Sequence, residues 1–113
     1  MKDFQSKTCR IALVQGSPVM FDKEKTVQKA VEQIKEAAEQ GAKLIVFPES
    51  YIPCYPLRLT FGFTVGARTE EGREDWKKYY DNSVVVPGPS TECLAQAGKK
   101  HGVFERIGIT ERD

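Results

Sequence analysis

Glu49 is the residue whose type and position could most readily do chemistry. It follows the apolar run 44–47, which is typical of a strand buried on both faces. Pro48 ends that run, because proline cannot donate a backbone hydrogen bond to a ladder. In layered α/β proteins, ligands and catalytic groups collect at the carboxyl ends of strands. We therefore expect Glu49 to act as a general base.

The neighbours of Glu49 favour this interpretation over a solvated acid at a strand exit. Residues 46–48 and 51–53 are apolar, aromatic or proline. Such neighbours are expected to withdraw the carboxylate partly from water, and a proton acceptor needs that environment.

The three cysteines offer a weaker candidate for a nucleophile. Cys54 lies in the same stretch as Glu49, and a thiol beside a base is the usual arrangement for activation. A short loop with prolines seldom brings two such side chains together, and nothing nearby supplies an oxyanion hole, so a structural role is favoured. Cys9 and Cys93 are expected to be small apolar packing residues. An odd number of cysteines without a CxxC pair argues against a disulfide framework or a zinc site.

Charge and hydropathy exclude some classes of partner. Seventeen Lys and Arg are interspersed with sixteen Asp and Glu, which argues against nucleic acid or an anionic membrane as the main ligand. Residues 1–10 lack the apolar core of a signal peptide, and no run approaches the ~20 apolar residues of a membrane span. We expect a cytoplasmic protein that has no membrane partner.

The elements that must position Glu49 follow the order βαβααβ, which predicts an α/β fold in one domain. A first strand is expected over residues 10–15. The following helix begins at the cap Asp22 and ends at Gly41. Its apolar side chains recur at helical spacing and are expected to cover the sheet: Val27, Ala30, Val31, Ile34, Ala37 and Ala38.

Two more helices and a third strand are predicted beyond the loop. One helix spans residues 73–82, and its stripe of Trp76, Tyr79 and Tyr80 is interpreted as packing surface. The other is capped by Ser90 and ends at His101, which would face the negative end of the helix dipole.

The third strand, over residues 103–110, departs from an apolar pattern. Glu105 and Arg106 interrupt it and should point to opposite faces of the sheet. Either these charges pair locally, or the strand has drifted from the pattern of a buried strand.

The stretch 41–56 resembles the first signature of the nitrilase superfamily of carbon-nitrogen hydrolases. The one departure is Cys54, where that pattern has glycine, and it predicts either a strained backbone or a slightly different turn. The residues in register with the signature are Gly41, Leu44, Ile45, Phe47, Glu49, Ile52, Tyr55 and Pro56.

Other segments extend the resemblance. Residues 10–15 look like the first strand of the family, and residues 65–95 are similar to its nitrilase branch. Within the latter, Arg68, Gly72, Arg73 and Tyr79 favour nitrilases over the amidase and carbamoylase branches, although the branch stays open.

The resemblance implies a fold and a reaction. The fold is the N-terminal part of an α-β-β-α sandwich, with residues 1–113 forming the N-terminal third of a carbon-nitrogen hydrolase domain. The reaction converts a nitrile, or an amide-like substrate, through a Glu, Lys and Cys triad without cofactor or metal. Glu49 takes the place of the general base, and Tyr51 and Tyr55 are expected either to line the substrate pocket or simply to pack.

Only the glutamate of that triad is present, so the chain by itself is predicted to be inactive. Three strands drawn from a two-sheet sandwich would leave an unpaired edge and the inner face of the sheet uncovered. The alternative to a piece of a nitrilase is therefore a non-catalytic truncated remnant, or an interaction module that pairs with a full-length homologue. A homo-oligomer is expected only by analogy with the family.

Overall fold

The structure is a computed structural model that describes residues 8–55 and 69–113. Pro56, Arg68 and residues 65–67, which carried part of the resemblance, lie outside these ranges. The predicted α/β class is confirmed. The elements in chain order are β1 (Ile11–Leu13), α1 (Lys23–Glu39), β2 (Leu44–Val46), α2 (Glu70–Asp81), β3 (Val84–Val85), α3 (Pro89–His101), β4 (Phe104–Arg106) and β5 (Glu111–Arg112).

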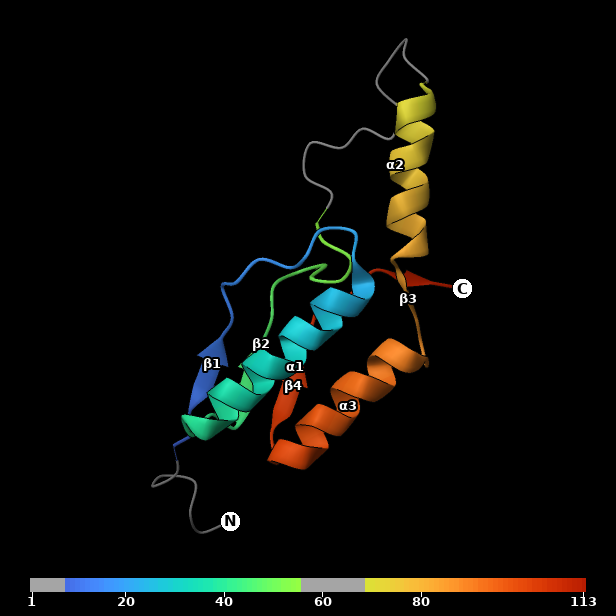
Figure 1. The fold of residues 1–113 in the computed structure, drawn as a ribbon. Helices are drawn as coiled ribbons and strands as arrows, with labels where there is room; N and C mark the ends of the chain where they lie inside the picture. The colour runs from blue at the N-terminus through green and yellow to red at the C-terminus, as the bar shows by residue number, and fades with distance from the viewer. Residues whose placement is uncertain (1–7, 56–68) are drawn as a thin grey trace.

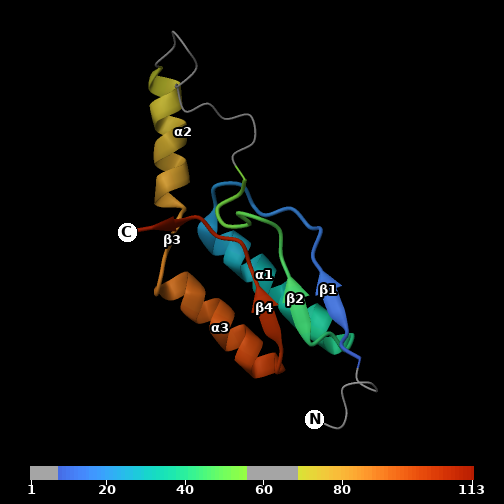
Figure 2. The ribbon, with the colours of Figure 1, turned by 180° about the vertical axis from the view of Figure 1, so that it is seen from behind.

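A parallel sheet with the order β1-β2-β4 forms the centre of the fold. Ile45 of β2 lies between Ala12 of β1 and Glu105 of β4. Helices α1 and α3 run side by side on one face of this sheet (Figure 1). Seen from behind, none of the described helices or strands lies over this sheet (Figure 2). The described part of the chain is therefore a two-layer structure.

The two faces of the sheet differ sharply in exposure. Ile45 points toward the helices and is fully buried, whereas Leu13 and Phe104 point the other way and are 71% and 80% exposed. Leu44 and Val46 share that open face and are only partly buried. The expectation that the central strand is buried on both faces is wrong for this chain, and the predicted uncovered inner face is confirmed.

Helix α1 begins and ends where the sequence predicts. Asp22 Oδ1 accepts a hydrogen bond from the Lys25 backbone N–H at 3.1 Å. Gln40 closes the helix, and Gly41 turns the chain with a φ of +91°. The apolar face buries Val27, Ala30 and Ile34 against the sheet and α3.

The N-termini of the other two helices differ from the prediction. Helix α2 starts at Glu70 rather than residue 73, because the Thr69 hydroxyl accepts from the Gly72 N–H at 3.0 Å. Helix α3 is capped by Gly88 rather than Ser90, with Pro89 in its first turn. Proline has the backbone φ of a helix and suits its first position, so the helix begins before Ser90 is reached.

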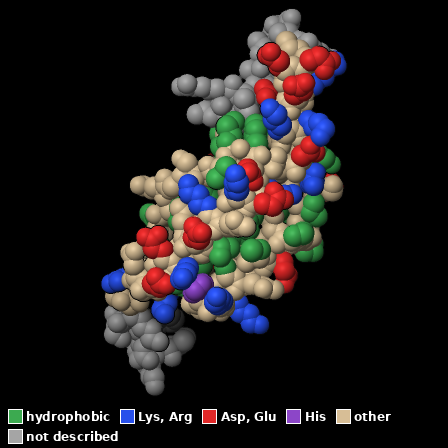
Figure 3. All heavy atoms as spheres, viewed as in Figure 1, with side chains coloured by type: hydrophobic (Ala, Val, Ile, Leu, Met, Phe, Trp, Pro, Cys, Tyr) green, Lys and Arg blue, Asp and Glu red, His purple; other side chains and the backbone are tan. Residues whose placement is uncertain are grey.

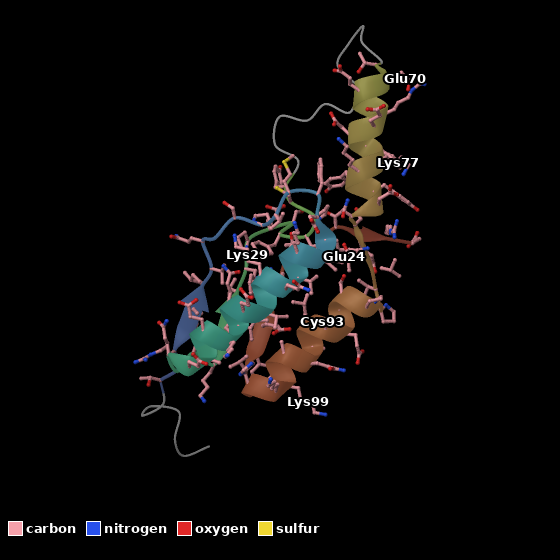
Figure 4. The ribbon with its side chains drawn as sticks, in the orientation of Figure 1. Glu24, Lys29, Glu70, Lys77, Cys93 and Lys99 are labelled. Atoms are coloured by element: carbon pink, nitrogen blue, oxygen red, sulfur yellow. The ribbon has the colours of Figure 1, made fainter. Side chains whose placement is uncertain are left out.

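In the aromatic stripe of α2, Tyr79 packs against an aromatic ring outside the helix. Tyr79 meets the edge of the Phe21 ring, with the ring centroids 6.0 Å apart. Trp76 and Tyr80 are 47% and 40% exposed and stack on one another, so the predicted packing surface is wrong for both. The reason is that α2 projects beyond the sheet, as the positions of Glu70 and Lys77 also show (Figures 1 and 4).

The predicted third strand is divided. Only Phe104–Arg106 joins the sheet, and Glu111–Arg112 pairs in parallel with Val84–Val85 in a second, two-stranded ladder. The connecting residues 107–110 run along the loop that follows β2, through a parallel bridge between Ile109 and Ile52. The contact with this loop takes them out of the sheet.

Glu105 and Arg106 lie on opposite faces of β4, as predicted. They form no ion pair, and the ion pairs of the described residues all lie within a helix or at its cap. Glu105 Oε2 is buried beside Gly98 and finds no hydrogen-bond partner in the described part of the chain. Burial raises the pKa of this carboxyl group.

The surface agrees with the mixed charge of the sequence. On the helix face both signs of charge are present, with acidic side chains gathered at the start of α2 and basic ones around the histidine at the end of α3 (Figure 3). His101 stands in the last turn of α3 with Lys99 and Lys100, as predicted. Cys9 and Cys93 are exposed, so their predicted apolar packing is wrong. Among the described helices, none combines the length and the apolar composition that crossing a lipid bilayer requires.

Candidate active site

The candidate site is the Glu49 loop, residues 47–55, which leaves the central strand at its carboxyl end. Two backbone hydrogen bonds hold its root. Val14 N–H donates to the Val46 carbonyl at 2.8 Å, and Phe47 N–H donates to the Arg106 carbonyl at 2.8 Å. The loop therefore starts from a point that both neighbouring strands restrain.

Glu49 itself is exposed and makes no hydrogen bond or ion pair with any described residue. The predicted partial withdrawal of its carboxylate from water is wrong for this chain. The physical reason is that its apolar neighbours turn inward. Phe47, Tyr51 and Ile52 are 5%, 1% and 0% exposed and fill the core beneath the loop instead of surrounding the carboxylate.

Tyr51 and Tyr55, the two predicted substrate-binding residues, lie in different environments. Tyr51 is buried against the Phe47 ring, and its hydroxyl donates to Gln33 Oε1 on α1 at 3.0 Å. Burial raises the pKa of this phenol. Within the described residues Tyr51 packs, which was the alternative expectation. Tyr55 is 54% exposed at the end of the described loop.

Cys54 has a strained backbone, which is one of the two outcomes that its departure from glycine predicts. Its φ is +127°, a conformation that side chains rarely adopt. Its N–H donates to the carbonyl of Ser50, which also has a positive φ, of +46°. The Cys54 thiol contacts the Tyr55 carbonyl at 3.6 Å and not Glu49. The loop thus positions no thiol beside the carboxylate, in line with a structural role for Cys54.

One contributor to the site was missed at the level of sequence, namely the segment of residues 106–110. Thr110 N–H donates to the Ile52 carbonyl at 2.9 Å, and Ile52 N–H donates to the Gly108 carbonyl at 3.3 Å. A glycine inside a strand pattern often marks a close backbone approach, and Gly108 was such a signal. What it approaches could not be inferred without the fold.

Two hollows in the described surface lie away from Glu49. One, of about 660 Å³, follows the free edge of β1 beside α1 and includes Gln33. The other, of about 410 Å³, lies between the starts of α1 and α3, where Glu24 and Cys93 stand (Figure 4). Nowhere in residues 8–55 and 69–113 do three or more His, Cys, Asp or Glu gather as metal ligands.

The geometry supplies one part of a catalytic apparatus. A carboxylate stands at the surface on a restrained loop, where it could exchange protons with a group brought from outside the described residues. The described part of the chain places no nucleophile beside it.

Comparison with known proteins accounts for such a partial site. The sequence profile of the carbon-nitrogen hydrolase family matches residues 10–113. An aliphatic nitrilase of Sinorhizobium fredii is 45% identical over 104 residues, which are 92% of this chain and 34% of that protein. A bifunctional nitrilase/nitrile hydratase of Lupinus angustifolius is 40% identical over 111 residues, 98% of this chain and 32% of the relative. Nitrilase 3 of Arabidopsis thaliana is 43% identical over 108 residues. The chain spans about a third of the length of these curated relatives.

Proposed function

Because this chain belongs to the carbon-nitrogen hydrolase family, we propose that it is the N-terminal, base-bearing third of a nitrilase domain. Nitriles would be converted to carboxylic acids and ammonia, with Glu49 as the general base. The lysine and the nucleophilic cysteine that the family resemblance implies would come from residues beyond Asp113. The chain alone is then inactive.

The position of Glu49 is the observation that carries the proposal. It stands at the carboxyl end of the central parallel strand, where ligands gather in α/β folds, and its backbone is held on both sides by hydrogen bonds. Its side chain is exposed and not engaged elsewhere in the described structure, so it can meet groups that a further segment brings. Tyr55, exposed in the same loop, is the better candidate for contacting substrate, and Tyr51 supports the loop from beneath.

The proposed reaction balances with two molecules of water. A cysteine thiol adds to the nitrile carbon, its proton passes to the nitrile nitrogen, and a thioimidate forms. The first water displaces ammonia and leaves a thioester, and the second water releases the carboxylic acid and restores the thiol. Glu49 takes protons from the attacking thiol and waters and returns them to the leaving groups.

A chimera tests this proposal. In it, this chain replaces the matching third of the Sinorhizobium fredii aliphatic nitrilase, and ammonia release from an aliphatic nitrile is measured. We expect the chimera to release ammonia and the 113-residue chain alone to release none. Glu49→Gln should lower kcat of the chimera by about 10²- to 10⁴-fold, the usual worth of a positioned general base.

Glu39→Gln is the matched control, because Glu39 is an exposed glutamate at the end of α1, on another part of the surface. It should leave kcat unchanged. Full activity of the Glu49→Gln chimera, or ammonia release by the isolated chain, would contradict the proposal.

A second candidate, an interaction module for a full-length homologue, is supported by the uncovered sheet face. Ile11, Leu13 and Phe104 are 52%, 71% and 80% exposed there. Exposed apolar surface of this kind favours association with a partner. Mixing the chain with the intact relative and measuring co-elution by size exclusion tests this candidate. A chain that elutes as a stable lone monomer in the presence of the relative would count against it.

A further inference from the structure

Gly108 approaches the backbone of the Glu49 loop so closely that a side chain would not fit. A β-carbon built on Gly108 would lie 2.5 Å from the Ser50 nitrogen, 2.7 Å from the Pro48 oxygen and 2.8 Å from the Glu49 α-carbon. All three are backbone atoms, which cannot yield by rotating a side chain. The Gly108 backbone thus lies directly against the residue proposed as the base and both its neighbours.

Backbone hydrogen bonds join the two segments on either side of this contact. Before Glu49, the Phe47 N–H donates to the Arg106 carbonyl, and after it, Ile52 exchanges hydrogen bonds with Gly108 and Thr110. The 106–110 segment therefore follows the loop on both sides of Glu49, with Gly108 between the two attachments.

The two ends of the loop segment around Glu49 are fixed in the core. The rings of Phe47 and Tyr51 are buried in the core, and the Tyr51 hydroxyl is bonded to Gln33 on α1. A close-packed core resists displacement because its neighbours leave no room. An added methyl group at Gly108 would consequently shift the backbone of residues 48–50, which carries Glu49.

We propose that Gly108 is a positioning residue for Glu49, and that its missing side chain sets where the carboxylate stands. This inference rests on the proposed function, since it concerns the placement of the proposed base. Misplacing a catalytic group by about 1 Å can cost about 10²-fold in rate. Gly108 lies 59 residues after Glu49 in the chain, so the effect acts through the tertiary contact.

The first experiment uses the chimera defined above. Gly108→Ala is expected to lower kcat by about 10- to 100-fold with a much smaller change in KM. Gly102→Ala is the control: Gly102 has a φ of +66°, so alanine strains the backbone there too, but nothing lies within 4 Å of the added carbon. The control should lose stability and keep kcat. An unchanged kcat for a folded Gly108→Ala chimera would overturn the inference.

The second experiment separates positioning of Glu49 from a general structural effect. Glu49→Asp shortens the base by one methylene and already misplaces the carboxylate. Adding Gly108→Ala should then cost much less in kcat than it does with Glu49 present, because both changes act on one group. Equal fold losses in the two backgrounds would mean that Gly108 does not act through Glu49.

A Gly108→Ala chimera that does not fold would show that this contact supports folding rather than the placement of Glu49, and would overturn the inference. If Glu49→Gln leaves the chimera fully active, the proposed function fails and this inference with it. If Glu49→Gln abolishes activity but Gly108→Ala does not lower it, only the inference fails.

Discussion

The Tyr51 hydroxyl donates a hydrogen bond to Gln33 Oε1 on α1 at 3.0 Å and ties the Glu49 loop to the helix layer. Tyr51 follows Glu49 by two residues, and its ring is buried against Phe47 at the root of the loop. A single tyrosine thus connects the strand end, the loop and the helix. The loop is restrained from within the core as well as by its backbone hydrogen bonds.

Replacing Tyr51 with phenylalanine should remove that tie and preserve the packing. We expect Tyr51→Phe to lower the free energy of unfolding of the chain by about 1 kcal/mol, the typical net value of one hydrogen bond. Urea unfolding measures this. Tyr55→Phe, at a site that is 54% exposed, should change stability by less than about 0.5 kcal/mol. Equal effects of the two substitutions would contradict a stabilising hydrogen bond from the Tyr51 hydroxyl.

The cap of α1 makes a separate prediction about stability. Asp22→Ala removes the acceptor of the Lys25 N–H and should cost about 1 kcal/mol. Lys25→Ala is the control, because the Lys25 ammonium lies 3.9 Å from Asp22 with a largely exposed side chain and should contribute only about 0 to 0.5 kcal/mol. Thermal unfolding followed by circular dichroism compares them. A larger loss for Lys25→Ala would show that the ion pair, not the cap, stabilises the helix start.

The positive φ of Cys54 predicts an inverted response to glycine. At an ordinary loop position, a glycine variant is less stable than an alanine variant, because the unfolded chain gains more conformational freedom with glycine. At Cys54, with a φ of +127°, alanine keeps the strain and glycine relieves it. We expect Cys54→Gly to be about 1 kcal/mol more stable than Cys54→Ala in urea unfolding. Both variants lack the thiol, so its loss does not affect the comparison. A Cys54→Ala variant more stable than Cys54→Gly would contradict the proposed backbone strain at this position.

Glu105 predicts a pH dependence of stability. Its folded-state pKa is raised by burial, so the folded chain holds the proton more tightly than the unfolded chain does. Below the unfolded pKa of about 4.3, the carboxyl group is protonated in both states and its burial as a charge costs no stability. As the pH rises from there through the folded pKa, the free energy of unfolding decreases. Glu105→Gln should therefore be more stable than the parent chain at pH 7, with the difference shrinking toward pH 4.

Melting temperatures across this pH range provide the measurement for Glu105. Glu111→Gln serves as control, because Glu111 is an exposed acid of β5 without a hydrogen bond among the described contacts. The melting temperature of Glu111→Gln should match that of the parent chain at every pH. A Glu105→Gln variant that is less stable than the parent at pH 7 would show that the carboxylate has a partner when ionised.

Local patterns predicted several features correctly. Asp22 and Gly41 delimit α1, because a side-chain acceptor and a glycine suit the two ends of a helix in almost any fold. Pro48 and Glu49 mark the end of the central strand for an equally local reason. The departure of Cys54 from a motif predicted either a strained backbone or a slightly different turn, and its positive φ is the first of these.

Other features depended on contacts between distant residues. The aromatic side chains Trp76 and Tyr80 have helical spacing, but spacing does not reveal that α2 projects beyond the layer they were expected to cover. The exposure of Glu49 was missed for a related reason, since its apolar neighbours could surround it or turn into the core.

By itself, the sequence determined the α/β class, the position of Glu49 at a strand end and the likeness to carbon-nitrogen hydrolases. Only the tertiary structure decided that residues 107–110 leave the sheet to run along the Glu49 loop, and that Gly108 lies against its backbone. Helix caps and strand ends arise from interactions between near neighbours, which a sequence displays directly. The choice of a partner 59 residues away depends on how all the elements share one core, and this becomes visible only when they are packed together.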